Sequence, residues 1–229
     1  DSITWIKSLS PDIIFCFGWS RLLKKKLLNL PPSGVLGYHP ASLPANRGRH
    51  PIIWSLILGM TKTSSTFYFM DEMADSGNIL SQNPISISIN DNASSLYEKL
   101  VGSAIKQLKE FLPTLESRDY KSIKQNHNKA NYWRKRDFKD GKIDWRMSAE
   151  SINNLVRALS KPYPGAHFIF KGEVVKVWKT KIVKNDKKNI EPGKVILLSK
   201  NGILVKTGND AVCLMETDCI LDIELGSYL

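Results

Sequence analysis

Hydrophobic and polar residues along the first part of the chain form blocks that predict strands and a helix. Continuous apolar runs at 13–17 and 35–38 predict buried strands, because a strand covered on both faces carries few polar positions. Between them, the segment 21–30 has leucines on one side and lysines on the other, which predicts a helix ended by Pro31. Strand, helix and strand in this order are typical of an α/β sheet.

The middle of the chain continues with longer elements. A helix and three strands are expected next, at 51–58, 65–70, 79–82 and 85–89. The segment 94–115 predicts a long amphipathic helix, since apolar residues recur at every fourth position and Ser95 precedes Glu98 by three residues, as in a capping box. A second amphipathic helix is expected to begin after Ser148, its N-cap residue.

After residue 165 the hydrophobic period changes to two, which predicts a series of strands. These strands are expected at 167–170, 172–178, 195–198, 203–206 and 212–216. The charged segment 184–192 is poor in apolar residues and is the candidate boundary. We therefore expect an α/β domain with its connector at 1–183 and a small β domain at 192–229.

Composition and charge narrow the class of protein. Of 229 residues, 42% are hydrophobic, and the longest apolar stretch, 52–60, is too short to cross a bilayer, so no membrane partner is expected. Three cysteines without a Cys-x-x-Cys motif argue against a disulfide framework or a structural zinc, and they indicate a reducing, cytoplasmic compartment. The formal net charge of +11 raises the affinity for polyanions without choosing among them.

Candidate chemistry gathers where the predicted strand 35–38 ends. His39 leaves that strand, a loop with Asn46 and Arg49 follows, and Asp75 lies in a later loop. Open α/β sheets bind ligands at such strand ends, and a histidine beside a carboxylate suits proton transfer. The guanidinium group of Arg49 can pair with a phosphate or carboxylate through two hydrogen bonds. The alternative is an ordinary histidine, a turn aspartate and a surface arginine.

Two stretches of the chain resemble a known family, the formyltetrahydrofolate-dependent formyltransferases. Residues 37–51, Gly-Tyr-His-Pro-Ala-Ser-Leu-Pro-Ala-Asn-Arg-Gly-Arg-His-Pro, resemble the family's Asn-x-His-x-Ser-Leu-Leu-Pro motif with its following Arg-Gly and Pro. Residues 70–80, Met-Asp-Glu-Met-Ala-Asp-Ser-Gly-Asn-Ile-Leu, resemble its Asp-x-Gly-Asp loop. The resemblance implies a Rossmann-like formyltransferase domain, here without its first strands, followed by an OB-like β unit. Segments 140–145 and 162–178 resemble the part that joins the two.

The resemblance assigns two of the family's three catalytic residues, a histidine and an aspartate, to His39 and Asp75. Gly37 stands where the family has an asparagine, whose carboxamide holds the formyl oxygen and its developing charge. Losing one such donor commonly lowers the rate on the order of 100- to 1000-fold. Either a protonated His39, a backbone N–H group or a neighbour such as Asn46 replaces it, or the chain is a weak or inactive member that acts as a binding module.

The resemblance also implies the co-substrate, 10-formyltetrahydrofolate, and a reaction that needs no metal. The implied contacts of the folate are Phe17, Gly18, Trp19, Leu22, Met73 and Ala74. For Trp19 a plain core aromatic residue is the alternative. Arg49 and Asn46 are the expected substrate contacts.

The acceptor is expected to be a nucleotide-linked amino sugar, used in surface lipopolysaccharide, because segments 46–51 and 131–136 look most like those of sugar-nucleotide N-formyltransferases. The alternative is methionyl-tRNA, which the net charge and the basic segment 179–188 favour. In segment 131–136, Tyr132 and Trp133 are either a connector packed on the domain or a platform for stacked bases. The sequence leaves a homodimer open.

Overall fold

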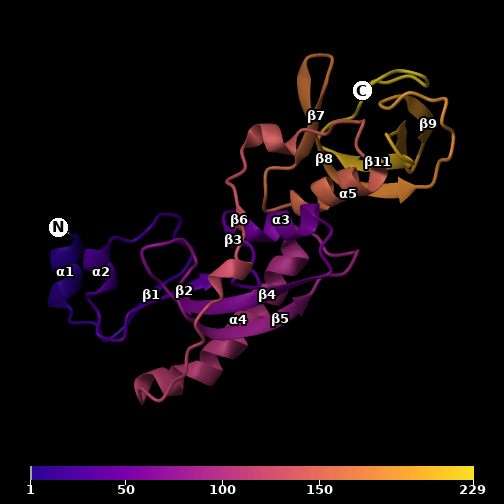
Figure 1. Ribbon diagram of the computed structural model, residues 1–229. Helices are drawn as coiled ribbons and strands as arrows, with labels where there is room; N and C mark the ends of the chain where they lie inside the picture. The colour runs from indigo at the N-terminus through magenta and orange to yellow at the C-terminus, as the bar shows by residue number, and fades with distance from the viewer. Residues whose placement is uncertain (1) are drawn as a thin grey trace. The chain divides into compact units, whose positions relative to one another are not determined.

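The computed structural model describes residues 2–229 and divides into two compact units (Figure 1). Unit 1 comprises the residues up to Pro51, Lys62–Ser86 and Glu98–Lys135, and unit 2 comprises Ile52–Thr61, Ile87–Tyr97 and Arg136–Leu229. The helices are α1 (Ser2–Ser8), α2 (Lys25–Leu28), α3 (Pro51–Ile57), α4 (Ala93–Glu116) and α5 (Ala149–Ala158), with 3₁₀ turns at His127–Lys129 and Phe138–Gly141. The strands are β1 (Ile14–Cys16), β2 (Val35–His39), β3 (Arg47–Gly48), β4 (Lys62–Phe69), β5 (Ile79–Ser86), β6 (Tyr132–Trp133), β7 (Ala166–Phe170), β8 (Glu173–Val183), β9 (Val195–Ser199), β10 (Gly202–Lys206) and β11 (Ala211–Thr217).

The main sheet of unit 1 has the strand order β1-β2-β4-β5. β1 and β2 are parallel, as expected from their buried apolar runs, and the other pairs are antiparallel. On one face Leu36 and Phe67 pack with Phe111 of α4, which runs along β4 and β5 (Figure 1). Because side chains alternate along a strand, Gly37 and His39 lie on the face opposite α4.

Helix α4 confirms the strongest helix prediction but differs from it in detail. Its capping pair is formed by Asn92 and Ser95, each of which accepts a hydrogen bond from the backbone N–H group of the other, at 3.1 and 3.0 Å. Leu112, expected on the apolar stripe, is 42% exposed. A spacing of four drifts around a helix of 3.6 residues per turn, so the buried line passes instead through Gln107 and Phe111.

Two other elements differ from expectation. The helix expected at 21–30 is only the short α2, because Leu22 is 62% exposed and short helices need tertiary packing to form. The two strands expected at 79–82 and 85–89 are one strand, β5. Pro84 lies within it without breaking it, since β5 is at the edge of the sheet and its outer side needs no N–H donor.

Unit 2 is built on an antiparallel sheet of order β7-β8-β11-β10-β9. Helix α5 packs against β8 and β11, and Ser148 caps it by accepting a hydrogen bond from the Ser151 N–H group at 3.1 Å, as predicted. Strands β7 and β8 precede the candidate boundary at 184–192 and the other three strands follow it, so one sheet contains strands from both sides. The domain limits 1–183 and 192–229 stay a prediction. Among residues 2–229 no helix is both long enough and apolar enough to cross a membrane.

Candidate functional site

His39 ends β2 and is buried, with 4% of its surface exposed. Its Nε2 atom lies 2.7 Å from the carbonyl oxygen of Asn46, and since a carbonyl only accepts, Nε2 is the donor. Its Nδ1 atom lies 3.6 Å from Oδ2 of Asp75, so that a protonated ring forms an ion pair with this carboxylate. The structure therefore brings together the histidine and the aspartate singled out by the sequence.

Asp75 is held at both of its carboxylate oxygens. Tyr68 donates its phenol proton to Oδ1 at 2.7 Å, and the backbone N–H group of Gly48 donates to Oδ2 at 2.8 Å. Burial, and next the negative charge of Asp75, raise the pKa of Tyr68 far above its usual range. The phenol therefore stays protonated and remains a donor at neutral pH.

A layer of polar side chains supports the Asp75 loop from behind. Gln125 donates to the carbonyl oxygens of Asp75 and Gly77, at 2.9 and 2.6 Å. Arg47, only 1% exposed, donates to Oε1 of Gln125 at 2.6 Å and to the hydroxyl group of Tyr132 at 2.9 Å. These hydrogen bonds fix the loop that carries the carboxylate.

Asn46 takes part in the site through its backbone. Its carbonyl oxygen accepts from His39, and its N–H group donates to Oδ1 of Asn131 at 2.8 Å. The residue has a positive φ of 66°, a conformation that asparagine tolerates better than most residues. The expected substrate role of its carboxamide stays a prediction.

The residues expected to hold the folate lie in two segments: four follow β1, and Met73 and Ala74 lie in the loop after β4. Arg49 donates to the carbonyl oxygen of Ser20 at 2.7 Å and so joins the loop after β1 to the segment after β3. Phe17 packs edge to face with Phe67, on the α4 side of the sheet and thus away from the His39 face. Gly18 has a positive φ of 67°, Ala74 directly precedes Asp75, and the exposed side chains are Trp19, Leu22 and Met73. Their contacts with folate stay a prediction.

The sequence motifs did not reveal two residues of this network, Tyr68 and Gln125, and Tyr132 was singled out only as part of a connector or a stacking platform. Arg47 belongs to the Arg-Gly match, which was its only signal. Gln125 lies in a polar connector without periodicity, and its role appears only when β4 and this connector are placed in space.

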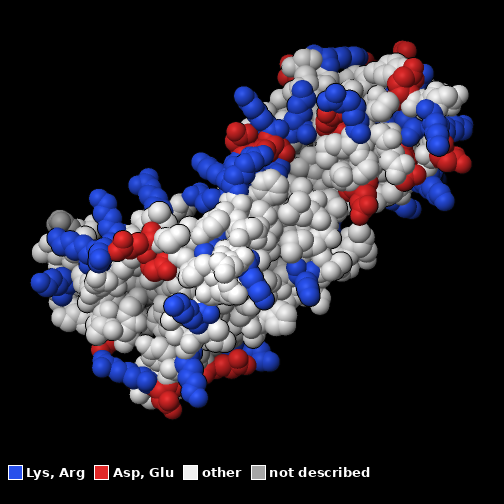
Figure 2. All heavy atoms as spheres, in the orientation of Figure 1, with Lys and Arg blue, Asp and Glu red and all other residues white. Residues whose placement is uncertain are grey.

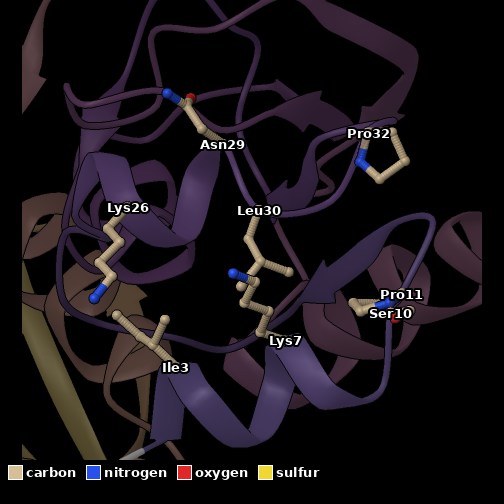
Figure 3. A pocket seen from close by; sticks show the side chains of 8 residues that line it. All are labelled: Ile3, Lys7, Ser10, Pro11, Lys26, Asn29, Leu30 and Pro32. Atoms are coloured by element: carbon tan, nitrogen blue, oxygen red, sulfur yellow. The ribbon is translucent and has the colours of Figure 1, made fainter.

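A hollow of about 570 Å³ lies elsewhere in unit 1 (Figure 3). It is lined by α1, α2 and the segments next to them, through Ile3, Lys7, Ser10, Pro11, Lys26, Asn29, Leu30 and Pro32. These residues include none of the predicted site. Within residues 2–229, no three side chains of His, Cys, Asp or Glu gather as a metal site requires.

Two family models match the chain. The first, described as formyl transferase, matches residues 1–112, and the second, described as formyl transferase, C-terminal domain, matches residues 137–219. Between them they cover both the His39 region and the sheet of unit 2.

Individual proteins are also similar to the chain. It is 39% identical over 220 residues to methionyl-tRNA formyltransferase of Halothermothrix orenii, covering 93% of this chain and 69% of that protein. The structure of HypX from Aquifex aeolicus with tetrahydrofolic acid matches with a TM-score of 0.73 and 20% identity, over 94% of this chain and 37% of that chain. An N-formyltransferase from Helicobacter canadensis, in complex with folinic acid and dTDP-3-aminofucose, matches with a TM-score of 0.69 and 19% identity, over 88% and 72% of the two chains. Both structures share the fold of this chain.

Proposed function

The chain belongs to the formyl transferase family, and we propose that it transfers a formyl group from 10-formyltetrahydrofolate to a primary amine. The match to the family model and the 39% identity to a relative confirm the family, the enzyme class and the α/β fold class that the motifs led us to expect. The observation that carries the proposed reaction is the contact between buried His39, at the end of β2, and half-buried Asp75, in the loop after β4, with Nδ1 and Oδ2 3.6 Å apart.

The proposed reaction needs one proton transfer between two nitrogen atoms. The amine nitrogen forms a bond to the formyl carbon, and the bond from that carbon to the folate nitrogen breaks. A proton leaves the amine and one is delivered to the folate nitrogen, which gives a formamide and tetrahydrofolate. In this proposal His39 carries the proton, and the carboxylate of Asp75 lies 3.6 Å from its Nδ1 atom. The hydrogen bond to Asn46 orients the ring.

For the acceptor we propose a nucleotide-linked amino sugar in a cytoplasmic reaction that leads to surface polysaccharide. The fold is shared with the Helicobacter canadensis enzyme, whose structure contains dTDP-3-aminofucose. Arg49 supports this proposal, because its guanidinium group binds Ser20 through one N–H group and has further donors suited to a diphosphate.

A second candidate acceptor is methionyl-tRNA, which the 39% identity to the Halothermothrix orenii enzyme favours. The lysines of segment 179–188, Lys179, Lys181, Lys184, Lys187 and Lys188, are all exposed. In Figure 2, Lys and Arg side chains stand out around β7, β8, β9 and β11, with acidic side chains between them. A tRNA site would make binding fall steeply with salt.

Mass spectrometry of formyl transfer decides between the acceptors. The purified protein is incubated with 10-formyltetrahydrofolate and either a panel of dTDP- and UDP-amino sugars or methionyl-tRNA. Formylated sugar is the expected product. Formylation of tRNA alone would establish the second candidate, and folate binding without any product would establish the inactive binding module.

Substitutions at the site test the assignment of His39 and Asp75. Since general acid–base catalysis contributes about 10²- to 10⁴-fold, His39→Asn and Asp75→Asn should each lower kcat by amounts in this range. Asp222→Asn is the matched control, because the side chain of Asp222 is fully exposed. Unchanged turnover in His39→Asn would remove the histidine from the mechanism.

A further inference from the structure

Gly37 and Tyr68 are direct partners across the antiparallel pair of β2 and β4. A Cβ atom built on Gly37 would lie 2.8 Å from Cγ of Met70, and 3.0 and 3.1 Å from Cζ and Cε1 of Tyr68. The contact with Met70 is closer than real Cβ atoms come to other atoms, and the contacts with Tyr68 are tighter than nearly all real ones. The Met70 side chain and the phenol end of the Tyr68 ring therefore occupy the space where a side chain at position 37 would begin, and such a side chain would have to shift both.

The Tyr68 hydroxyl group has a definite task in that space. Tyr68 is 4% exposed, and its hydroxyl group donates its one proton to Oδ1 of Asp75 at 2.7 Å. Because that proton is committed, the phenol cannot at the same time donate to a formyl oxygen. Its effect is to set the plane of the carboxylate and leave Oδ2 for the Gly48 N–H group and His39.

We propose that Tyr68 is a positioning residue that fills the place of the family's asparagine side chain and holds Asp75 so that Oδ2 faces His39. This inference rests on the proposed function, in which His39 and Asp75 move the proton. It explains how Asp75 is held in place although position 37 is a glycine. Gly37, which has no carboxamide, is paired with Tyr68, and the Tyr68 hydroxyl group holds Asp75 by a hydrogen bond.

Kinetics of Tyr68→Phe test the positioning role. A hydrogen bond to a charged group is lost, so kcat should fall about 10- to 100-fold. KM should stay within about threefold, and the midpoint of the pH–rate profile should shift, because the carboxylate is no longer fixed beside the histidine. Tyr38→Phe is the matched control, since its ring lies on the α4 face and its hydroxyl group bonds to Leu100. A Tyr68→Phe enzyme with wild-type kcat and pH profile would overturn the proposal.

The pairing of the two positions is tested by restoring the asparagine. Gly37→Asn alone should lose at least 100-fold in kcat, because its side chain collides with Tyr68 and Met70. Gly37→Asn combined with Tyr68→Leu, which removes the contact with the phenol ring, should have a higher Tm than Gly37→Asn, while kcat stays low because the hydrogen bond to Asp75 is lost. A double variant no more stable than Gly37→Asn would show that the tyrosine does not fill the place of the carboxamide.

A thermal double-mutant cycle gives a readout that does not depend on turnover. Tyr68→Phe and Asp75→Ala should lower Tm by less together than the sum of their separate effects, because both remove the same hydrogen bond. Additive losses would contradict the proposal even in an active enzyme. Coupled losses in a protein that transfers no formyl group would instead contradict the proposed function and leave the contact between Tyr68 and Asp75 established.

Discussion

Gln125 joins Arg47 to the Asp75 loop through a single buried amide. Its NH₂ group donates hydrogen bonds to two backbone carbonyl oxygens, and its Oε1 atom accepts one from the guanidinium group of Arg47. A side chain with both donors and an acceptor is required here, because the carbonyl groups of Asp75 and Gly77 need donors while Arg47 needs an acceptor.

Replacing Gln125 with methionine keeps the length of the side chain and removes its polar groups. We expect each buried carbonyl group that loses its donor to cost about 1–3 kcal/mol of unfolding free energy, with a fall in kcat as the carboxylate loses its support. Urea unfolding and formyl-transfer assays measure the two effects. Lys124→Met, at the exposed neighbouring position, should change neither. Equal stability of the two variants would mean that water replaces the amide at no cost.

The sequence predicted the candidate catalytic residues better than the residues that hold them in place. His39 ends an apolar strand and Asp75 lies in the loop after another, and the structure brings them together. The contact of Tyr68 with Gly37 depends on the register of β2 against β4, which a single sequence does not specify. For Gln125, the deciding factor is how a loop without periodicity packs behind the site.

Among the elements, α5 offers the cleanest local test because one side chain caps it. Ser148→Ala removes the acceptor for the Ser151 N–H group and should cost about 1 kcal/mol of unfolding free energy. Ser148→Asp retains an acceptor at the helix start and should recover most of the loss. Chemical denaturation of the wild type and the two variants measures the free energy of unfolding. An equal loss in both variants would show that an aspartate at position 148 cannot replace serine as the cap.

The elements that were predicted well have the signals for their formation within their own sequence. Helix α4 combines a capping pair with an apolar stripe, and each signal is local in sequence. The length of α2 was overestimated because Leu22, unlike the buried Leu28, has no buried surface to pack against, which is a property of the surroundings and not of the segment. Strand β5 was divided in two because the tolerance of Pro84 depends on its edge position.

For the molecule as a whole, His167 couples stability to pH. Burial, and next the positive charges of Lys142 and Lys176, lower the pKa of His167 from 6.5. The folded protein thus binds a proton less readily than the unfolded chain, so the contribution of the neutral ring is present above about pH 6.5 and is lost as the pH falls through the folded-state pKa.

Replacing His167 with phenylalanine should flatten this part of the pH dependence. The histidine ring is stacked on Phe138 with centroids 4.1 Å apart, and a phenyl ring can retain that contact. Urea unfolding at pH 5 to 8 should show that the free energy of unfolding falls less with decreasing pH in His167→Phe than in the wild type. Parallel curves for the two proteins would show that other groups set the acid sensitivity.

Unit 2 is assembled from three separate stretches of chain, and Arg157 shows what this means. Its guanidinium group binds the carbonyl oxygens of Leu56, Ser88 and Asp91, all of which precede residue 98. A gene segment that begins near residue 136 would encode the strands of this unit but leave those three anchor points behind. A chain cut at that point would therefore leave the Arg157 guanidinium group without these three carbonyl acceptors.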